Sequence, residues 1–518
     1  MKKPFFRKES FIKETMVMRN VSERKEGSEE REIVKRFADF GFQVHPEAIE
    51  LLKHYSSNRK SHFDIGELAE SVIKSIDPSI FVVTPEQIAD FIQKKGARAA
   101  EREKSVVEQE MQAEAPAILK SFPEHGRGAD YKEFLQQFID RYERISGIIK
   151  KRLKCGQIRF IQNGKGSEGV SVVGMVSSIH KTAKGNIRVE LEDCTGTLSV
   201  IVPHHEEIIP DEVIGVTGFL SHGGYLIADR ILYPDVPIPS STAQLSLPLP
   251  EKEKQEGTAL YAVFISDLHV GSTTFLEEAW NSFVQWLKEA AKSSKIAYLV
   301  VAGDIVDGIG VYPGQEEDLL ITDIEEQYKR AAGYLRDIPS HIQVVLAPGN
   351  HDAVRSAEPQ PPLPGDIRKF FPNDTCFVSN PAYIQIGGRQ VLIYHGQSYD
   401  DFVNSVSRLS YSKPEDVMIE MLRRRHLAPI YGNNVSIVPD GHDYGVIDPV
   451  PEILHCGHAH TVGISKYRNV LLINSGTWQS QTPYQKKRGI NPVAGCATVV
   501  ELSELKVKVM DFGRRSGA

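Results

Sequence analysis

Cysteine is scarce in this sequence, and the few cysteines follow no regular spacing. There are five cysteines in 518 residues, an odd number, and no two form a Cys-x-x-Cys pair. Disulfide scaffolds and zinc–thiolate sites both need more cysteine at regular intervals. The sequence therefore excludes a disulfide framework and favours a reducing cytoplasm. Cys456, directly before Gly457-His458, is expected to pack at a strand end.

Long apolar runs and an excess of positive charge are also lacking. No stretch approaches the roughly 20 consecutive apolar residues that span a bilayer. The basic N-terminus, Met1–Arg7, is not followed by the apolar segment of a signal peptide. We therefore expect a cytoplasmic chain without a membrane segment. The formal net charge of -7 does not indicate nucleic-acid binding, although a local basic groove would be enough for it.

The length and the changes in sequence pattern predict a multidomain protein of mixed α+β and α/β class. A chain of 518 residues is long enough for about three domains, each with its own core. The predicted segments are a flexible arm with a small helical domain at 1–95, a charged linker with an amphipathic helix at 96–155, an OB-like β-barrel at 156–236, a second linker at 237–257 and a two-sheet α/β sandwich at 258–518. The pattern does not indicate what the helical domain binds.

The barrel is predicted from about five short strands separated by glycine-containing turns. Ile187–Leu191, for example, alternates strictly between apolar and polar residues. OB barrels often bind single-stranded nucleic acid through stacked aromatics. The strands here offer few aromatics beyond Tyr225, so packing against protein is an equal alternative. In the linker that follows, Gln244–Leu249 is similar to peptides that dock on sliding clamps, a pattern that also arises by chance.

After residue 258, short apolar strands alternate with helical patterns. Residues 279–291 form one such helix, with Trp280, Phe283 and Leu287 on one face. This alternation predicts chemistry-bearing loops at the strand ends of a sandwich. The long insert at 401–442 is expected to serve as a gate or as a partner surface.

Five polar motifs each follow an apolar, strand-like run. They are Asp267-Leu268-His269, Gly303-Asp304-Ile305-Val306-Asp307-Gly308, Gly349-Asn350-His351-Asp352, Tyr394-His395-Gly396 and Gly457-His458-Ala459-His460. In an extended segment, Asp267 and His269 leave the same face and can grip one ion. Each motif alone also reads as a helix cap, a turn or a core histidine. Five of them at successive strand exits favour a functional site.

The side chains in these motifs suit two divalent metal ions. The candidate ligands are Asp267, His269, Asp304, Asn350, His395, His458 and His460. Several imidazoles with two carboxylates and an amide favour Mn²⁺, Fe²⁺ or Zn²⁺, whereas Mg²⁺ sites use oxygen almost alone. We expect Mn²⁺, with the other three as alternatives. Such ion pairs stabilise in-line displacement at phosphorus.

The leaving oxygen of that displacement needs a proton, and His351 is the candidate donor. Asp352 is expected either to orient His351 or to cap the loop. Asp307 is expected to support a ligand or to cap its turn. Four further histidines lack a motif context and are predicted to be structural: His341, His426, His442 and His455. Two basic runs, Arg423–Arg425 and Lys486–Arg488, could contact a phosphate backbone or simply be solvated.

The motif set resembles that of the calcineurin-like metallophosphoesterases over about 260–480. The order of helical region, OB-like barrel and phosphoesterase domain, with Phe264–Ser272, Leu346–Asp352 and Tyr394–Asp401, resembles more closely the small subunits of archaeal family D DNA polymerases. That resemblance implies a 3′–5′ proofreading exonuclease with a separate large catalytic subunit, acting on the 3′ end of a DNA primer.

The resemblance also assigns the ligands. It implies that Asp267, His269, Asp304 and His460 hold the first ion and that Asp304, Asn350, His395 and His458 hold the second, while His351 protonates the 3′-oxygen. Related eukaryotic subunits have lost these ligands, and here every position is filled. The alternatives are a stand-alone repair nuclease or phosphodiesterase, which the long stretch ahead of the site disfavours, and a non-catalytic assembly subunit with a vestigial site.

Overall fold

The computed structural model describes most of the chain in two compact units, residues 1–110 and 111–518. The described residues are 30–57, 65–77, 80–92, 114–123, 131–162, 169–183, 185–238, 259–290, 295–487 and 489–513. No helix among them is long and apolar enough to cross a membrane. The expected N-terminal arm at 1–27 and the clamp-like peptide at 244–249 lie outside these residues.

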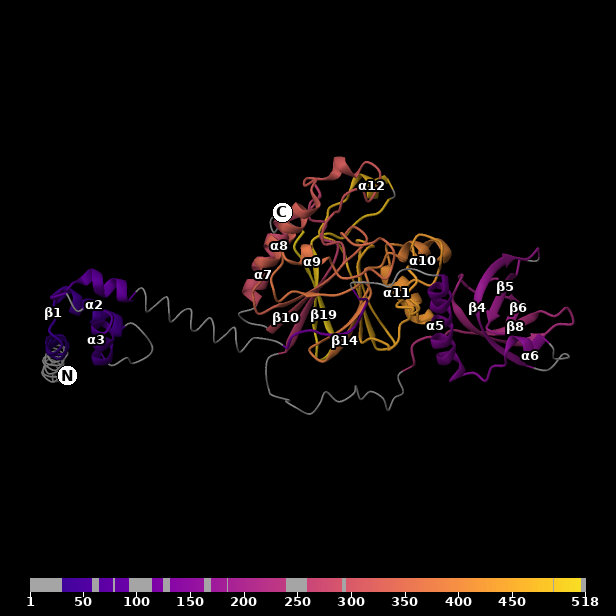
Figure 1. Ribbon diagram of the computed structural model, residues 1–518, viewed down its shortest axis with the longest axis horizontal. Coiled ribbons are helices and arrows are strands. Elements are labelled where there is room, and N and C mark those ends of the chain that lie inside the picture. The colour runs from indigo at the N-terminus through magenta and orange to yellow at the C-terminus, as the bar shows by residue number, and fades with distance from the viewer. Residues whose placement is uncertain are drawn as a thin grey trace, which may run out of the picture. The chain divides into compact units, whose positions relative to one another are not determined.

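The N-terminal unit is mainly helical (Figure 1). Its elements are helical stretches at 30–39 and 85–92, α2 (Pro46–Ser57), α3 (Ile65–Ile73), and a two-stranded parallel sheet of β1 (Gln43–Val44) and β2 (Val82–Val83). Proline at the first position of α2 costs no backbone hydrogen bond, because the N–H there has no helical partner. Ile33, Phe37 and Leu52 are fully buried in its core, so the helical spacing of apolar residues in the sequence produces one packed face.

The second unit contains a closed five-stranded barrel. Its strands are β4 (Val170–Lys181), β5 (Ile187–Asp193), β6 (Gly196–Val202), β7 (Val213–Leu220) and β8 (Leu226–Leu232), in the order β4-β5-β6-β8-β7. The short helix α6 (Ile158–Gln162) precedes them. Val189, Leu191 and Val200 are buried inside, as the period-two alternation of the strands requires.

Two six-stranded sheets form the sandwich that follows. The first has the order β12-β11-β10-β9-β18-β19 and consists of β9 (Leu260–Ile265), β10 (Lys295–Ala302), β11 (Gln343–Ala347), β12 (Cys376–Phe377), β18 (Cys496–Glu501) and β19 (Lys506–Asp511). The second has the order β16-β17-β15-β14-β13-β3 and consists of β3 (Ala117–Ser121), β13 (Ala382–Ile386), β14 (Arg389–Ile393), β15 (Ile453–Cys456), β16 (Val462–Tyr467) and β17 (Val470–Ser475). This is the mixed α/β architecture that the alternating pattern predicts.

Helices and apolar side chains cover both faces of each sheet. The helices are α7 (Glu277–Ala290), α8 (Ile324–Arg336), α9 (Gly365–Arg368), α10 (Tyr399–Ser405), α11 (Pro414–Arg424), α12 (Pro483–Lys487) and the 3₁₀ turn η1 (Gln315–Asp318). Phe264, Val300 and Ile393 are fully buried in the layer between the sheets. Each such side chain contributes about 1.5–3 kcal/mol, which fixes the strand ends where the motifs begin.

The region expected to be a linker and a helix contains a strand as well. β3 pairs antiparallel with β13, and Ser121 Oγ lies 2.9 Å from Ser379 Oγ. The helix follows as α5 (Tyr131–Lys150), whose Arg141 is buried against the later chain. The second sheet of the sandwich therefore begins before the barrel in the sequence, so that the barrel lies between two parts of one sheet.

The insert at 401–442 is built into the core. Helix α11 buries Val417, Met418 and Met421 in the cluster on the outer face of the second sheet. A hinged gate would bury few apolar side chains. The expectation that this insert is a gate is therefore wrong for α11, which is a fixed cover of that sheet.

Candidate metal centre

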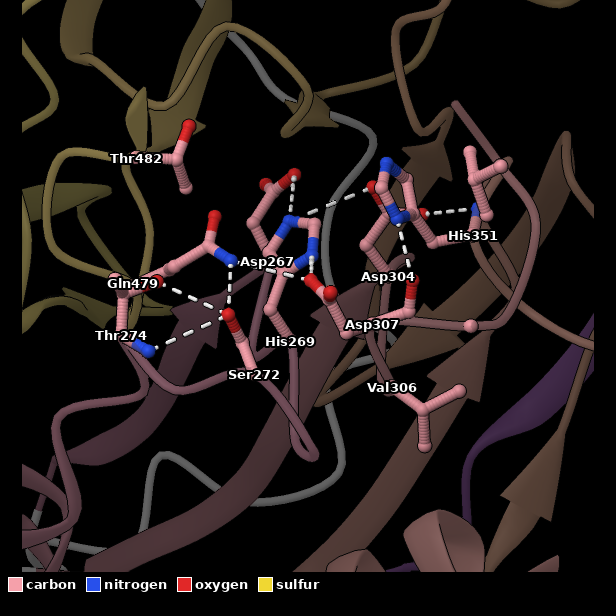
Figure 2. Close-up of polar contacts among 12 residues, drawn as sticks. Asp267, His269, Ser272, Thr274, Asp304, Val306, Asp307, His351, Gln479 and Thr482 are labelled. Carbon is pink, nitrogen blue, oxygen red and sulfur yellow. Dashed lines mark hydrogen bonds and ion pairs between the residues drawn. The ribbon is translucent and has the colours of Figure 1, made fainter. Parts of the chain in front are cut away.

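The five motifs meet at one edge of the sandwich. Asp267 follows β9, Asp304 follows β10 and Asn350 follows β11, which are parallel neighbours in the first sheet. His395 follows β14 and His458 follows β15, which are parallel neighbours in the second. Because parallel strands end at the same edge, all seven candidate ligands converge there. Figure 2 shows the part of this cluster around His269.

The backbone at this edge is strained. Five of the seven candidate ligands have positive φ, a region that non-glycine residues rarely adopt: Asp267, His269, Asp304, His458 and His460. Each residue held at positive φ lowers the stability of the fold by on the order of 1–3 kcal/mol, and such residues gather at functional sites. Gly349 lies so close to the cluster that a Cβ there would lie 2.3 Å from Asp304 Oδ1. The glycines of the motifs are therefore required by close approach.

The first group of ligands surrounds His269. Its Nε2 lies 3.1 Å from His460 Nε2 and 3.7 Å from Asp304 Oδ2. His460 Nε2 in turn lies 3.3 Å from Asp267 Oδ1. All four side chains are at least nine-tenths buried. One ligand atom from each of Asp267, His269 and His460 lies within 4.8 Å of the other two, and two of these atoms are imidazole nitrogens that face each other. One cation would satisfy this geometry.

The second group surrounds Asn350. Its Oδ1 lies 2.9 Å from His395 Nε2 and 3.2 Å from His458 Nδ1. His395 Nε2 also lies 3.3 Å from Asp304 Oδ2. Asp304 therefore faces both groups, which is the position of a bridging carboxylate.

The charges of the cluster fit divalent cations. Among the described residues, Asp267 and Asp304 form ion pairs with histidines only. Burial alone would lower the pKa of His395, but Asp304 and Asp267 outweigh it and raise this pKa to about 10. Burial opposes ionisation of Asp304, yet the imidazoles, His395 first, hold its pKa well below the usual range. The raised pKa of His395 and the lowered pKa of Asp304 show that the carboxylates favour positive charge beside them, which a divalent ion would supply, so the residues present fit a metal ion.

The outer nitrogens of the ligand imidazoles are also held. His269 Nδ1 lies 2.9 Å from Asp307 Oδ1, and His395 Nδ1 lies 2.9 Å from the carbonyl of Ala302. His460 Nδ1 lies 2.8 Å from Gln485 Nε2. Such partners fix the ring orientation of a ligand. Asp307 supports His269, one of its two predicted roles. Gln485 belongs to none of the five motifs, and its only sequence signal is the capping signature Thr482-x-x-Gln485.

His351 lies beside the first group, and Asp352 lies beneath the loop. The backbone N–H of His351 donates to Asp304 Oδ1 at 2.9 Å, and its Nδ1 lies 2.7 Å from the carbonyl of Asp307. The carboxylate of Asp352 accepts hydrogen bonds from the Gly349 N–H and from the hydroxyl of Tyr328. The contacts of Asp352 are thus those of a loop cap, and the Asp307 carbonyl orients His351.

The other predicted structural residues make contacts of their own. His426 Nε2 lies 2.9 Å from Asp443 Oδ2, and the His442 Nδ1 lies 3.2 Å from Asp140. His455 is fully buried and packs edge-on against Phe264; burial lowers its pKa to about 3. Cys456 is buried at the end of β15.

Comparison with known proteins places the chain in a family. Residues 262–462 match the family of DNA polymerase alpha/epsilon B subunits. The DNA polymerase II small subunit of Archaeoglobus fulgidus is 41% identical over 500 residues, which cover 93% of this chain and 98% of that protein. The chain belongs to the archaeal DNA polymerase II small subunits.

Other members of the small-subunit family show the same extent of similarity. That of Methanothermobacter thermautotrophicus is 38% identical over 85% of this chain and 92% of its own, and that of Thermoplasma acidophilum is 35% identical over 93% and 92%. A solved structure described as a novel archaeal phosphodiesterase aligns with 48% of this chain and 98% of its own at 10% identity, but its TM-score of 0.25 is too low to support an argument.

Proposed function

We propose that this small subunit is the 3′–5′ exonuclease of a DNA polymerase and that it works with a large catalytic subunit. The observation that carries the proposal is the complete ligand set: seven buried or half-buried donors converge on one edge, and within the described part of the chain the two carboxylates among them form ion pairs with histidines alone. The relatives are named as small subunits, which supports the large partner. The strand order of the barrel supports its assignment as an OB-type fold.

The ligands divide between two divalent ions, for which we propose Mn²⁺. Asp267, His269, Asp304 and His460 would hold the first, and the second would be held by Asp304, Asn350, His395 and His458. When bound, such ions supply Lewis acidity, which neutralises charge on phosphoryl oxygens and favours ionisation of an attacking water. Burial of the ligands keeps bulk water out of the site, which strengthens every electrostatic interaction within it.

We assign to His351 the transfer of a proton to the leaving 3′-oxygen. Its Nδ1–H can donate to the carbonyl of Asp307, 2.7 Å away. That contact leaves Nε2 as the other protonated nitrogen of an imidazolium, free to donate to substrate. The side chain is only partly buried, so DNA can reach it. Asp352 caps the loop on which His351 stands and contributes to catalysis through that position.

Degradation of 3′-labelled primers with Mn²⁺ tests the proposal. The substrates are single-stranded DNA and a primer with a mismatched 3′ end, and the protein is used alone and with the large subunit. We expect His351→Ala to lower the rate about 10²–10⁴-fold, since it removes a general acid, and Asp304→Ala to abolish it.

His222→Ala, an exposed histidine of the barrel, is the matched control and should leave the rate unchanged. If wild type releases no nucleotide under any of these conditions while binding no Mn²⁺, the protein is a non-catalytic assembly subunit with a vestigial site. Strong activity of the isolated chain that the large subunit does not alter would favour a stand-alone nuclease.

A further inference from the structure

Helix α12 connects the metal centre to the protein surface. It begins with a reciprocal capping arrangement: the N–H of Gln485 donates to Thr482 Oγ1 at 3.2 Å, and the N–H of Thr482 donates to Gln485 Oε1 at 3.1 Å. A five-residue helix is marginal on its own, so these two hydrogen bonds define its start. Thr482 is labelled in Figure 2.

The same Gln485 side chain holds a proposed metal ligand. Its Nε2 donates to His460 Nδ1 at 2.8 Å, and both side chains are about nine-tenths buried. The other ring nitrogen of His460, Nε2, faces His269. A ligand nitrogen must be free of its proton. If Nε2 binds an ion, the proton moves to Nδ1, and the amide of Gln485 must turn over to present its oxygen there.

That turn changes the start of the helix. With Oε1 facing His460, the N–H of Thr482 faces the amide nitrogen and loses its acceptor. One side chain therefore serves either the helix cap or a loaded ligand, but a carboxylate at this position could serve both, because it offers two oxygens.

The outer face of α12 carries positive charge. Lys486 and Lys487 follow Gln485 directly, and both are exposed; Arg488, the third residue of this basic run, lies outside the described residues. The other basic run is largely buried: Arg424 and Arg425 are buried and Arg424 pairs with Glu212, while the half-buried Arg423 lies over the ring of Tyr233. Of the two runs predicted from sequence, the one beside the metal centre is the one available to phosphates.

We propose that α12 is the docking element for the DNA backbone, with Lys486 and Lys487 binding phosphates of the strand whose 3′ end enters the metal centre and Gln485 linking that contact to His460. This rests on the proposed exonuclease function and identifies how its substrate is held. Because the lysines and Gln485 lie on one short helix, binding of the DNA strand should change the affinity for the ion. By linkage, binding of the ion changes the affinity for the DNA strand by the same factor.

Binding of a single-stranded oligonucleotide to the full chain in EDTA tests the lysines without hydrolysis. The logarithm of the affinity falls with the logarithm of salt concentration by about 0.7 per phosphate contact in single strands. Lys486→Glu with Lys487→Glu should weaken binding and reduce that slope by about 1.4. The control is Lys506→Glu with Lys508→Glu, an equal charge change on exposed residues of β19. In the sheet register Lys506 lies opposite Glu501, and Glu501 lies opposite Tyr261. The control residues therefore lie near the start of β9, at the opposite end of that strand from Asp267.

Titration calorimetry with Mn²⁺ tests Gln485 without reference to activity. Gln485→Ala should weaken one ion site about 10–100-fold, as loss of a ligand's hydrogen-bond partner does. Gln485→Glu should bind at least as tightly as wild type. Thr482→Ala breaks the cap but leaves the contact between Gln485 and His460, so its Mn²⁺ affinity should stay within about twofold of wild type. If Gln485 had a merely structural role, Thr482→Ala and Gln485→Ala would lower the Mn²⁺ affinity alike.

The outcomes separate this inference from the exonuclease proposal. A wild-type chain that degrades primers, with a salt slope that the Lys486 and Lys487 changes do not alter, overturns the docking role. Equal loss of Mn²⁺ affinity in Gln485→Glu and Gln485→Ala overturns the link to His460. A chain that degrades nothing, yet shows both expected changes, retains the docking element and refutes only the nuclease.

Discussion

Two clusters of buried charge lie in the same unit, and they are neutralised in opposite ways. At the junction of α5 and the barrel with the sandwich, Asp443 Oδ2 lies 2.6 Å from Arg141 Nε and 2.9 Å from His426 Nε2. Nearby, Arg424 forms ion pairs with Glu212 and Glu420. At the metal centre, the buried carboxylates of Asp267 and Asp304 form ion pairs with imidazoles only, among the residues that the structure describes.

The difference is the one expected between a cluster that stabilises the fold and a site that binds metal. The junction carries its own permanent cations, because guanidinium stays charged at all relevant pH values, and its histidine and carboxylate complete the pairs. The metal centre carries groups that can release their protons to solvent when an ion binds in their place, on a backbone that is strained at five positions. We therefore expect loss of an ion-pair partner at the junction to lower the free energy of unfolding, and we expect metal binding at the metal centre to raise it.

The largest expected effect on stability is at the junction. Asp443→Asn leaves Arg141 buried without its carboxylate, so we expect a loss of about 3–5 kcal/mol in the free energy of unfolding at pH 7. Burial opposes ionisation of Asp443, but His426 and Arg141 outweigh it and hold its pKa far below the usual range. A depressed pKa gives stability that is present above the unfolded pKa of about 3.9 and is lost as pH falls, so the difference should shrink in acid.

Urea unfolding measures this directly. All three tryptophans, Trp280, Trp286 and Trp478, lie in the sandwich, so their fluorescence reports its unfolding. The double variant Asp443→Leu with Arg141→Met removes both charges and should recover most of the loss. If Asp443→Asn unfolds at the same urea concentration as wild type at pH 7, the pair is not a structural clamp.

The second-largest expected effect is the stabilisation of the folded protein by Mn²⁺ bound at the metal centre. At a Mn²⁺ concentration 100 times the dissociation constant, the free energy of unfolding should rise by about 2.7 kcal/mol for each site. Asp304→Asn should remove most of this gain, because Asp304 faces both groups of ligands. In Asp443→Asn, Mn²⁺ should raise the free energy of unfolding by the full amount, starting from a lower metal-free value.

Thermal unfolding with and without Mn²⁺ distinguishes the two clusters. The comparison fails if Mn²⁺ stabilises Asp304→Asn as much as wild type, or if the gain disappears in Asp443→Asn.

The smallest expected effect, for a change of one pH unit, is the dependence of metal binding on pH. With its pKa raised to about 10 in the metal-free protein, His395 contributes stability that is present below about pH 6.5 and is lost as pH rises through 10. An ion must displace that proton, so the affinity for Mn²⁺ should rise by about 1.4 kcal/mol per pH unit between these values. Calorimetry in two buffers of different ionisation enthalpy counts the proton released. No difference between the buffers at pH 8 would show that His395 is already neutral.

The sequence predicts the metal centre because its determinants are local. Each motif follows an apolar strand within a few residues, and parallel pairing brings the strand ends to one edge, as Asp267 after β9 and Asp304 after β10 illustrate. The seven candidate ligands therefore appear together in space, although their roles stay proposals. The contacts of Asp352 depend on Tyr328, a helical residue with no motif of its own.

What the sequence does not predict depends on distant pairing. The basic run at Arg423–Arg425 reads as surface charge, yet Arg424 is buried because Glu212 of the barrel pairs with it. Gln485 shows a local capping pattern, but its contact with His460 spans 25 residues. β3 is short, has exposed apolar residues such as Ile118 and follows a charged stretch, so no periodicity marks it as a strand.

The position of β3 also sets the timing of folding during synthesis. Ser121 contacts Ser379, which lies 258 residues later. At a synthesis rate of roughly 5–20 residues per second, this strand waits on the order of ten to fifty seconds for its partner. The whole barrel is made in that interval and can close first, because all of its strands lie between 170 and 232. The newly made chain is therefore expected to carry an unpaired, aggregation-prone strand ahead of a finished barrel.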